Sequence, residues 1–220
     1  LHLSLRRQRQ MCIRDSNYHE EKVQQFILKN KEHLSIGITI DGTEMKHDLN
    51  RVYKASGRGS YKDVVRNIPL WLSQFPDAST KVTISSADIP YIKESVLHLY
   101  ALGIHEVNIN CVFEDVWKAG DDRLFEEQLL MLADAIIDNG YYRDYSCSFF
   151  GEHLGKPLDC KLQNQNWCGA GMMLAVDAMG NFYPCTRFAQ YSLRNKKAWI
   201  IGNIHDGIDK NKLRPFLTLD

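Results

Sequence analysis

The stretch KVTISSADIPYIKESVLHLYALGIHEVNINCVF, residues 81–113, decides the fold class of this chain of 220 residues. Residues 81–85 and 107–113 are short runs rich in β-branched side chains, which is the composition of strands. Between them, residues 91–102 carry apolar side chains at helical spacing and stop before Gly103, a residue type that often follows the last turn of a helix. A strand, a helix and a second strand in this order predict a βα unit with parallel strands.

The alternation of helix and strand continues on both sides of this unit. Helices are predicted over residues 20–31, 61–75 and 121–138, and one further strand over 34–42, which ends in a polar turn. Three strands are too few for a closed eight-stranded barrel, so we expect an α/β fold that holds part of a TIM-type (β/α) barrel of parallel strands, without its opening elements. Ligands of such folds bind beyond the C-terminal ends of the strands. Those ends are residues 39–42, 85–88 and 110–112.

The chain divides into parts of different composition. Residues 1–16 are Arg-rich without periodicity, and residues 11–16 resemble translated sequencing-adapter sequence, so we expect a non-native or disordered tail. Residues 17–145 carry the partial barrel. Residues 146–220 begin with a segment rich in Gly, Pro, Asn and Cys, and then predict a tight β-hairpin over 173–184, a strand over 199–204 and a short helix.

Composition and charge exclude several classes of function. The chain is 44% hydrophobic and 25% charged, as in soluble globular proteins, and its formal net charge is zero. Without a basic face, nucleic acid is not expected as a partner. Without a run of about 18 apolar residues, a membrane span is not expected. No export signal opens the sequence, so we expect a cytoplasmic protein, in which cysteines serve metal or redox chemistry more often than disulfides.

Three of the six cysteines form a candidate metal site. Cys160, Cys168 and Cys185 follow the spacing Cys-x7-Cys-x16-Cys, and the last two bracket the predicted hairpin, which brings its two ends together. Thiolates bind Zn²⁺ or iron–sulfur clusters, and the spacing alone leaves both open, as it does the alternative of buried free thiols. Three ligands also leave a four-cysteine site incomplete.

The other cysteines fall outside this set. Cys111 lies inside an apolar predicted strand and is read as a packed core thiol. No spacing connects Cys147 to the three candidates, and Cys12 belongs to the suspect tail.

Three stretches together resemble the radical S-adenosylmethionine (SAM) enzymes that carry a C-terminal SPASM domain, of the peptide-maturing type. The first contains Ile-Thr-Ile-Asp-Gly, His-Asp-x-Asn-Arg and Gly-x-Gly-Ser-Tyr, at residues 38–42, 47–51 and 57–61. The second contains Cys-Gly-Ala-Gly and Asp-x-x-Gly-Asn-Phe-Tyr-Pro-Cys, at 168–171 and 177–185. The third is Ile-Gly-Asn-Ile at 201–204, before a helix. The likeness covers residues 20–220.

The resemblance implies roles for individual residues. Thr39 and Arg51 match positions whose hydroxyl and guanidinium contact SAM, and Val112 matches the position that packs on the adenine. Without the resemblance, Thr39 reads as an ordinary strand residue, Arg51 as a solvated turn residue and Val112 as core. Asp41 and Asp48 are interpreted as structural residues that cap turns.

The resemblance also implies cofactors, and departures from it matter. Cys160, Cys168 and Cys185 correspond to an incomplete set of ligands for an auxiliary [4Fe-4S] cluster. The Cys-x3-Cys-x2-Cys loop of the SAM-cleaving cluster and the later Cys-x2-Cys-x5-Cys run are both absent, so we expect an inactive fragment truncated at both ends. Thr186 stands where the sulfatase-maturing branch has a basic Asp, which disfavours sulfatase maturation.

The parent protein is therefore expected to be a radical SAM maturase of a peptide or protein, reduced by a flavodoxin or ferredoxin. No catalytic acid or base is assigned; Glu152 and His153 are the nearest candidates, and both read more simply as solvated loop residues. One alternative is a zinc-stabilised binding module in which His153 joins the cysteines. Another is a TIM-barrel enzyme of unrelated chemistry, which requires a charged cluster at the strand ends, where only Asp41 and Asp88 are expected.

Overall fold

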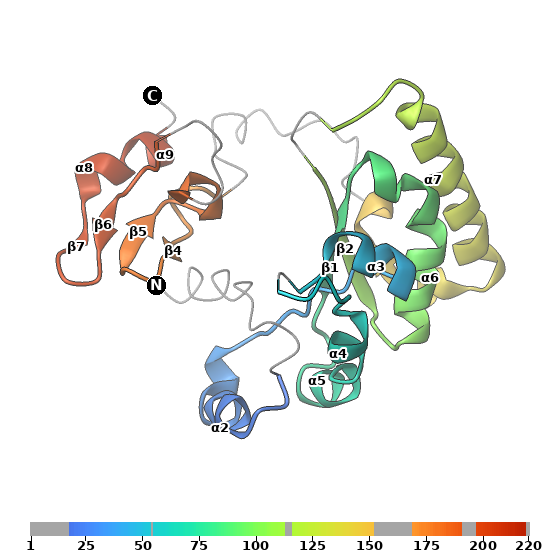
Figure 1. Ribbon diagram of the computed structural model, residues 1–220, viewed down its shortest axis with the longest axis horizontal. Helices are drawn as coiled ribbons and strands as arrows, with labels where there is room; N and C mark the ends of the chain where they lie inside the picture. The colour runs from blue at the N-terminus through green and yellow to red at the C-terminus, as the bar shows by residue number, and fades with distance from the viewer. Residues whose placement is uncertain (1–17, 54, 113–115, 152–168, 191–196, 219–220) are drawn as a thin grey trace. The chain divides into compact units, whose positions relative to one another are not determined.

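The computed structural model describes residues 18–53, 55–112, 116–151, 169–190 and 197–218 (Figure 1). These residues divide into two compact units, one ending at residue 151 and the other beginning at residue 169 among the described residues. Each unit is described by itself. Cys160 and Cys168, and the loop with Glu152 and His153, lie outside the described residues.

A parallel sheet forms the centre of the first unit. Its strands β1 (Thr80–Ile84), β2 (Glu106–Cys111) and β3 (Ser146–Cys147) lie in the order β1-β2-β3. Thr80 pairs with Val107 and Ile84 with Cys111, so the strands run in register toward the same edge. The sheet confirms the predicted βα unit with parallel strands. Strand β3 was not predicted, because two residues are too few to show periodicity.

The two faces of this sheet differ in chemistry. Val82, Ile84, Val107 and Ile109 are buried on one face, and they share a core with helices α6 (Ile92–Ala101) and α7 (Asp121–Asp138), which lie side by side in Figure 1. Side chains of a strand alternate between faces, so the intervening residues occupy the opposite face. They are polar and less buried: Lys81, Thr83, Asn108 and Asn110.

The predicted strand over residues 34–42 is wrong in detail. The segment is extended along β1 but forms no regular ladder: Lys81 N–H donates to the Ile38 carbonyl at 3.4 Å, and the Thr80 hydroxyl donates to the same oxygen at 2.7 Å. A side chain thus takes a place that a backbone group would hold in a strand. The predicted alternation persists, because Ile36, Ile38 and Ile40 are all buried.

The single helix predicted over residues 61–75 is also wrong. It is divided into α4 (Tyr61–Val65) and α5 (Ile68–Gln74). Pro69 lies in the first turn of α5, where it lacks an N–H to bond the preceding turn and its ring excludes the carbonyl four residues earlier. The apolar stripe survives the break, since Val64, Ile68 and Trp71 are buried.

The remaining elements of the first unit are short apart from α2 (Glu21–Asn30), which confirms the first predicted helix. Helix α3 (Glu44–Asn50) was read as a loop. Short 3-10 helices complete the unit at Lys31–His33, Ser86–Tyr91, Tyr141–Arg143 and Ser148–Phe150. Among the described residues, no helix has the length and apolar character needed to cross a bilayer.

The second unit is a small antiparallel sheet of β4 (Ala175–Val176), β5 (Asn181–Tyr183), β6 (Gly202–Asn203) and β7 (Gly207–Ile208). Strands β4 and β5 confirm the predicted hairpin. The strand predicted over residues 199–204 is formed only at β6. A 3-10 turn at Thr186–Phe188 and helices α8 (Lys210–Leu213) and α9 (Pro215–Thr218) complete the unit, with Asp209 capping α8.

One carboxylate organises the hairpin turn. Asp177 Oδ1 accepts the backbone N–H groups of Met179 and Asn181, each at 2.9 Å. Its Oδ2 accepts the Asn181 amide at 3.0 Å and the Tyr183 hydroxyl at 2.7 Å. The bonds from Tyr183 and Asn181 stabilise the charged form and lower the pKa of Asp177 to about 2. Gly180 follows with a positive φ of 81°, a conformation that favours glycine.

Candidate functional site

The candidate site is built by the loop and helix that follow the extended segment. Thr43 caps helix α3 by accepting the Lys46 N–H at 3.4 Å, and the helix turns Lys46 and His47 into the interior, where they are 2% and 0% exposed. The sequence offered one signal for this helix, a Thr followed by a Glu, which is a common helix start. Its seven residues were too few to show a clear period.

An ion pair joins this loop to the sheet. The Arg51 guanidinium donates to both carboxylate oxygens of Asp41, through Nε and Nη2. Asp41, which is 2% exposed, also accepts the backbone N–H of Thr83 at 2.9 Å, near the C-terminal end of β1. Asp41 is therefore more than a turn cap, because it fixes Arg51 at the strand ends. The Arg51 side chain remains 33% exposed.

A second, fully buried pair lies beside the first. The Lys46 ammonium is 3.7 Å from Asp88 and donates to the carbonyl of Thr83. Asp88 also accepts the N–H and hydroxyl of Ser85, at 2.8 and 2.6 Å, and the amide of Asn50. Burial lowers the pKa of Lys46, while the carboxylates of Asp41 and Asp88 oppose that shift.

The expectation that only Asp41 and Asp88 lie at the strand ends is therefore wrong, since Lys46 and Arg51 join them. This charged cluster does not by itself support an enzyme of unrelated chemistry. Lys46 and Asp88 are 2% and 1% exposed and bonded to each other, so neither reaches a ligand. Arg51 is the member of the cluster with an accessible charge.

A chain of hydrogen bonds holds the backbone around Arg51. The Asp41 N–H donates to His47 Nδ1 at 3.1 Å, which leaves the proton of the neutral ring on Nε2. His47 Nε2 lies 3.0 Å from Ser60 Oγ, and that hydroxyl donates to the Arg51 carbonyl at 2.8 Å. Burial lowers the pKa of His47 to about 4, so the imidazole is neutral at physiological pH.

Two glycines allow the loop to approach its neighbours closely. A Cβ at Gly42, where φ is 128°, would lie 2.2 Å from the Cβ of Ser95 on α6. A Cβ at Gly59 would lie 1.9 Å from the Asp48 carboxylate, which accepts the Tyr61 N–H at 2.9 Å. The structural role predicted for Asp48 agrees with this contact.

The three residues predicted to contact SAM lie in the same unit. Thr39 is half-buried in the extended segment, on the face opposite Ile38 and Ile40. The Val112 N–H donates to the Ile84 carbonyl at 2.9 Å, which places Val112 at the C-terminal end of β2 beside that of β1. Arg51 is joined through Asp41 to Thr83, also near the C-terminal end of β1, whereas Thr39 follows Ile38, whose carbonyl accepts the N–H of Lys81 nearer the start of that strand. Their contact with SAM stays a prediction.

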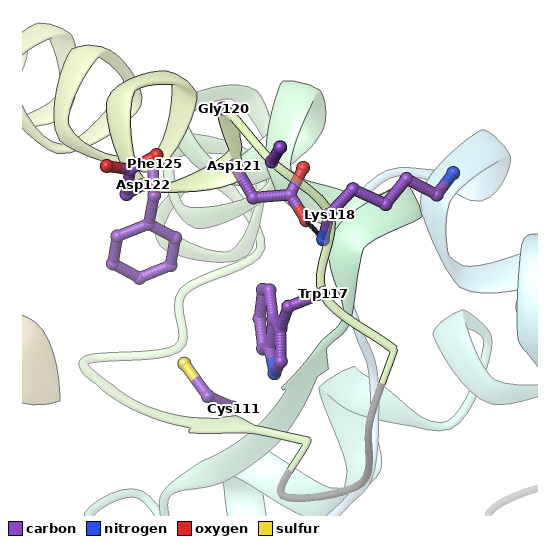
Figure 2. Close-up of a pocket in the computed structure, with 8 residues that line it drawn as sticks. Cys111, Trp117, Lys118, Gly120, Asp121, Asp122 and Phe125 are labelled. Atoms are coloured by element: carbon purple, nitrogen blue, oxygen red, sulfur yellow. Dashed lines mark hydrogen bonds between the residues drawn. The ribbon is translucent and has the colours of Figure 1, made fainter.

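A pocket of about 410 Å³ opens at the same end of β2 (Figure 2). Its walls include Cys111, Trp117 and Phe125, whose rings and thiol face a common space in Figure 2. The Trp117 indole N–H donates to the Val112 carbonyl at 3.0 Å, and the Lys118 side chain extends away from the rings. Burial raises the pKa of the Cys111 thiol. Asp121 and Asp122 also line the pocket, beside the apolar surface that Cys111, Trp117 and Phe125 provide.

The predicted metal ligands are only partly described. Cys185 is a free thiol, 8% exposed, two residues after the end of β5. Cys160 and Cys168, like Glu152 and His153, fall outside the described residues. Within the described part of the chain, no three His, Cys, Asp or Glu side chains lie close enough to hold a metal ion. The ligand set stays a prediction.

Solved structures with the same fold belong to anSMEcpe, an anaerobic sulfatase-maturating enzyme. Its native form with bound AdoMet, which is SAM, and the Cp18Cys peptide matches 92% of this chain with a TM-score of 0.64 and 20% sequence identity. The form with the Kp18Cys peptide matches with a TM-score of 0.63, at the same sequence identity and the same coverage of this chain. The fold of this chain is therefore similar to that of these structures. This chain spans 58% and 57% of those two chains. No family model and no curated protein matches the sequence.

Proposed function

We propose that the protein carrying this chain is a radical SAM maturase that acts on a peptide or protein. Residues 17–145 would contribute to a (β/α) barrel that binds SAM, and residues 146–220 would begin a SPASM-type domain for an auxiliary [4Fe-4S] cluster. SAM, reduced at a further [4Fe-4S] cluster, supplies the 5′-deoxyadenosyl radical that removes a hydrogen atom from the substrate. The likeness in fold to an enzyme solved with AdoMet and a peptide supports this proposal.

The observation that carries the proposal is that the Arg51 guanidinium is held along one edge and has a second edge available to a ligand. Asp41 occupies the edge of its guanidinium formed by Nε and Nη2. Within the part of the chain that the structure describes, Nη1 makes no hydrogen bond or ion pair, and the side chain is 33% exposed. A guanidinium has a second edge, formed by Nη1 and Nη2, that can donate two parallel hydrogen bonds to a carboxylate. The residues present therefore fit the carboxylate of SAM, and Val112 offers an apolar contact for its adenine.

The polar face of the sheet supports a barrel. Parallel sheets in open α/β folds are normally covered by helices on both faces, and their strands are apolar throughout. Here one face carries Lys81, Thr83, Asn108 and Asn110. Polar side chains on an inner face suit a barrel interior that receives a polar ligand.

Sulfatases are disfavoured as substrates in this proposal. Thr186, which is exposed at the 3-10 turn after Cys185, has a hydroxyl that does not titrate in the physiological range and is a poor base. A small peptide substrate and a flavodoxin or ferredoxin reductant fit the proposal better.

The cofactor-binding part is tested with the gene product of full length, reconstituted anaerobically with iron and sulfide. With dithionite and SAM, we expect 5′-deoxyadenosine to form, detected by mass spectrometry. Arg51→Lys removes the bidentate geometry and is expected to weaken SAM binding at least tenfold, equivalent to about 1.4 kcal/mol. Arg66→Lys, an exposed arginine on the same unit, is the matched control. Formation of 5′-deoxyadenosine with unchanged SAM affinity in Arg51→Lys would contradict the role of Arg51.

The cluster is tested by metal content. After reconstitution we expect a brown protein that contains iron, and Cys185→Ala is expected to lose part of that iron. Cys111→Ala and Cys147→Ala, at thiols whose pKa values are raised by burial, serve as controls and should retain it. A colourless protein with stoichiometric zinc would instead favour the binding module without SAM chemistry.

A further inference from the structure

The backbone of Arg51 is held as firmly as its side chain. Ser60 donates twice to the Arg51 carbonyl, from its hydroxyl at 2.8 Å and from its N–H at 3.0 Å. The Arg51 N–H donates to the His47 carbonyl at 3.1 Å. Arg51 is thus fixed at its N–H, its carbonyl and one edge of its guanidinium, although it follows the end of a helix of only seven residues.

His47 connects these restraints to the strand side of the site. Its Nδ1 accepts the Asp41 N–H, and its Nε2 donates to Ser60 Oγ. Asp41 pairs with the Arg51 guanidinium, and Ser60 holds the Arg51 carbonyl. The rigid, fully buried ring of His47 therefore connects these two residues. Exposed arginine side chains have several rotamers of similar energy, so fixing both ends removes an entropic cost from ligand binding.

We propose that His47 and Ser60 are positioning residues that hold Arg51 with its Nη1 edge directed to a carboxylate. This rests on the proposed function, because the carboxylate is that of SAM. His47 itself is 0% exposed and reaches no ligand, so it acts only through Asp41, Ser60 and Arg51.

Protonation of His47 is not part of this role. The ring faces Asp41 and Asp48, whose charges favour the imidazolium, and Arg51 and Lys46, whose charges oppose it. Nδ1 serves as an acceptor, and a proton there would break the bond from Asp41. The two hydrogen bonds of His47, to Asp41 and Ser60, therefore require the neutral ring.

Two substitutions of His47 separate its hydrogen bond to Asp41 from its hydrogen bond to Ser60. The amide of Asn matches the position of Nδ1, so His47→Asn retains an acceptor for the Asp41 N–H and loses the bond to Ser60. The longer Gln reaches the position of Nε2, so His47→Gln retains a donor to Ser60 and loses the bond from Asp41. Ser60→Ala removes the hydroxyl and keeps the backbone bond to Arg51. His98→Gln, which changes another imidazole bonded to a hydroxyl, that of Tyr61, is the matched control.

The experiment measures SAM affinity by equilibrium dialysis, with the reconstituted protein of full length, and the Arg51 side chain by ¹⁵N NMR on the 220-residue chain. One lost hydrogen bond corresponds to about a fivefold change in affinity. We expect Ser60→Ala and His47→Asn to weaken SAM binding about fivefold, His47→Gln to weaken it less, and His98→Gln to leave it within about twofold. The Arg51 Nε–H signal, assigned by its loss in Arg51→Lys, is expected to exchange faster with water in Ser60→Ala.

The outcomes separate this inference from the proposed function. If Arg51→Lys loses SAM affinity while Ser60→Ala and both His47 variants bind SAM as the unaltered protein does, the positioning role is wrong and the proposed function stands. If Arg51→Lys binds SAM normally, both are wrong. Should a His47 variant fail to fold, Ser60→Ala with its NMR signal still decides, because it removes a single oxygen from a half-buried side chain.

Discussion

Asp41 holds Arg51 by two donors of the same guanidinium edge, and it does so from a buried position at the end of an extended segment. Asp41→Asn is therefore expected to lower the free energy of unfolding by about 2 kcal/mol, because it removes the charged partner of Arg51 while the amide oxygen can still accept the Thr83 N–H. Urea unfolding followed by circular dichroism measures this. Asp63→Asn, which removes the charged partner of the exposed Arg58, is the control and should cost less than about 1 kcal/mol.

The buried pair of Lys46 and Asp88 gives a second prediction. Lys46→Met is expected to destabilise the first unit by about 3 kcal/mol, because it leaves the Asp88 carboxylate buried without a cation. The double variant Lys46→Met, Asp88→Asn should recover part of that loss. Lys62→Met removes the exposed partner of Glu44 and should change stability little. Additive losses in the double variant would show that the two side chains do not interact.

A third prediction concerns pH. His47 has a pKa of about 4 in the folded chain and about 6.5 when unfolded, so the unfolded chain binds a proton first as the pH falls. The contribution of neutral His47 to the free energy of unfolding is fully present above pH 6.5. It is lost as the pH falls toward 4, which lowers the free energy of unfolding by about 3 kcal/mol. Urea titrations at several pH values should show a smaller dependence in His47→Asn. His205→Gln, at an exposed position in the other unit, should keep the full dependence of the first unit.

The close approach of Gly42 to α6 gives a fourth prediction. Gly42→Ala is expected to cost at least about 2 kcal/mol, because the new methyl group meets Ser95 and the φ of 128° is unfavourable for alanine. Adding Ser95→Gly removes the two side-chain atoms that the methyl group would meet and should restore part of the loss, while the contact with the Cα of residue 95, at 2.8 Å, and the backbone strain persist. Gly57→Ala, also at positive φ but in open space, separates the two causes. Thermal unfolding of the three variants tests this.

Much of the sheet could be predicted because its pattern is regular. The strands and helix within residues 81–113 gave clear periods, and the structure has β1, α6 and β2 there. Residues 34–42 were harder, since alternation reports burial but not whether Thr80 replaces a ladder bond by its hydroxyl. The break before Pro69 could have been read from the proline itself.

The site could be predicted in part for a similar reason. Arg51 was found through a motif, and its pairing with Asp41 depends on a fold that brings residues ten positions apart into contact. Lys46 gave no signal, because a lysine that is 2% exposed looks in sequence like any surface lysine. Its partner Asp88 lies on a different element, beyond the reach of local pattern.

The Asp177 turn also bears on how the chain folds. All four donors to this carboxylate lie within six residues of it, so closing the turn costs little chain entropy. Hairpins closed by such local contacts form on the microsecond scale, whereas parallel pairing of β1 with β2 must wait for an intervening helix. The region around Cys185 can therefore be ordered early, while the sheet of the first unit is still assembling.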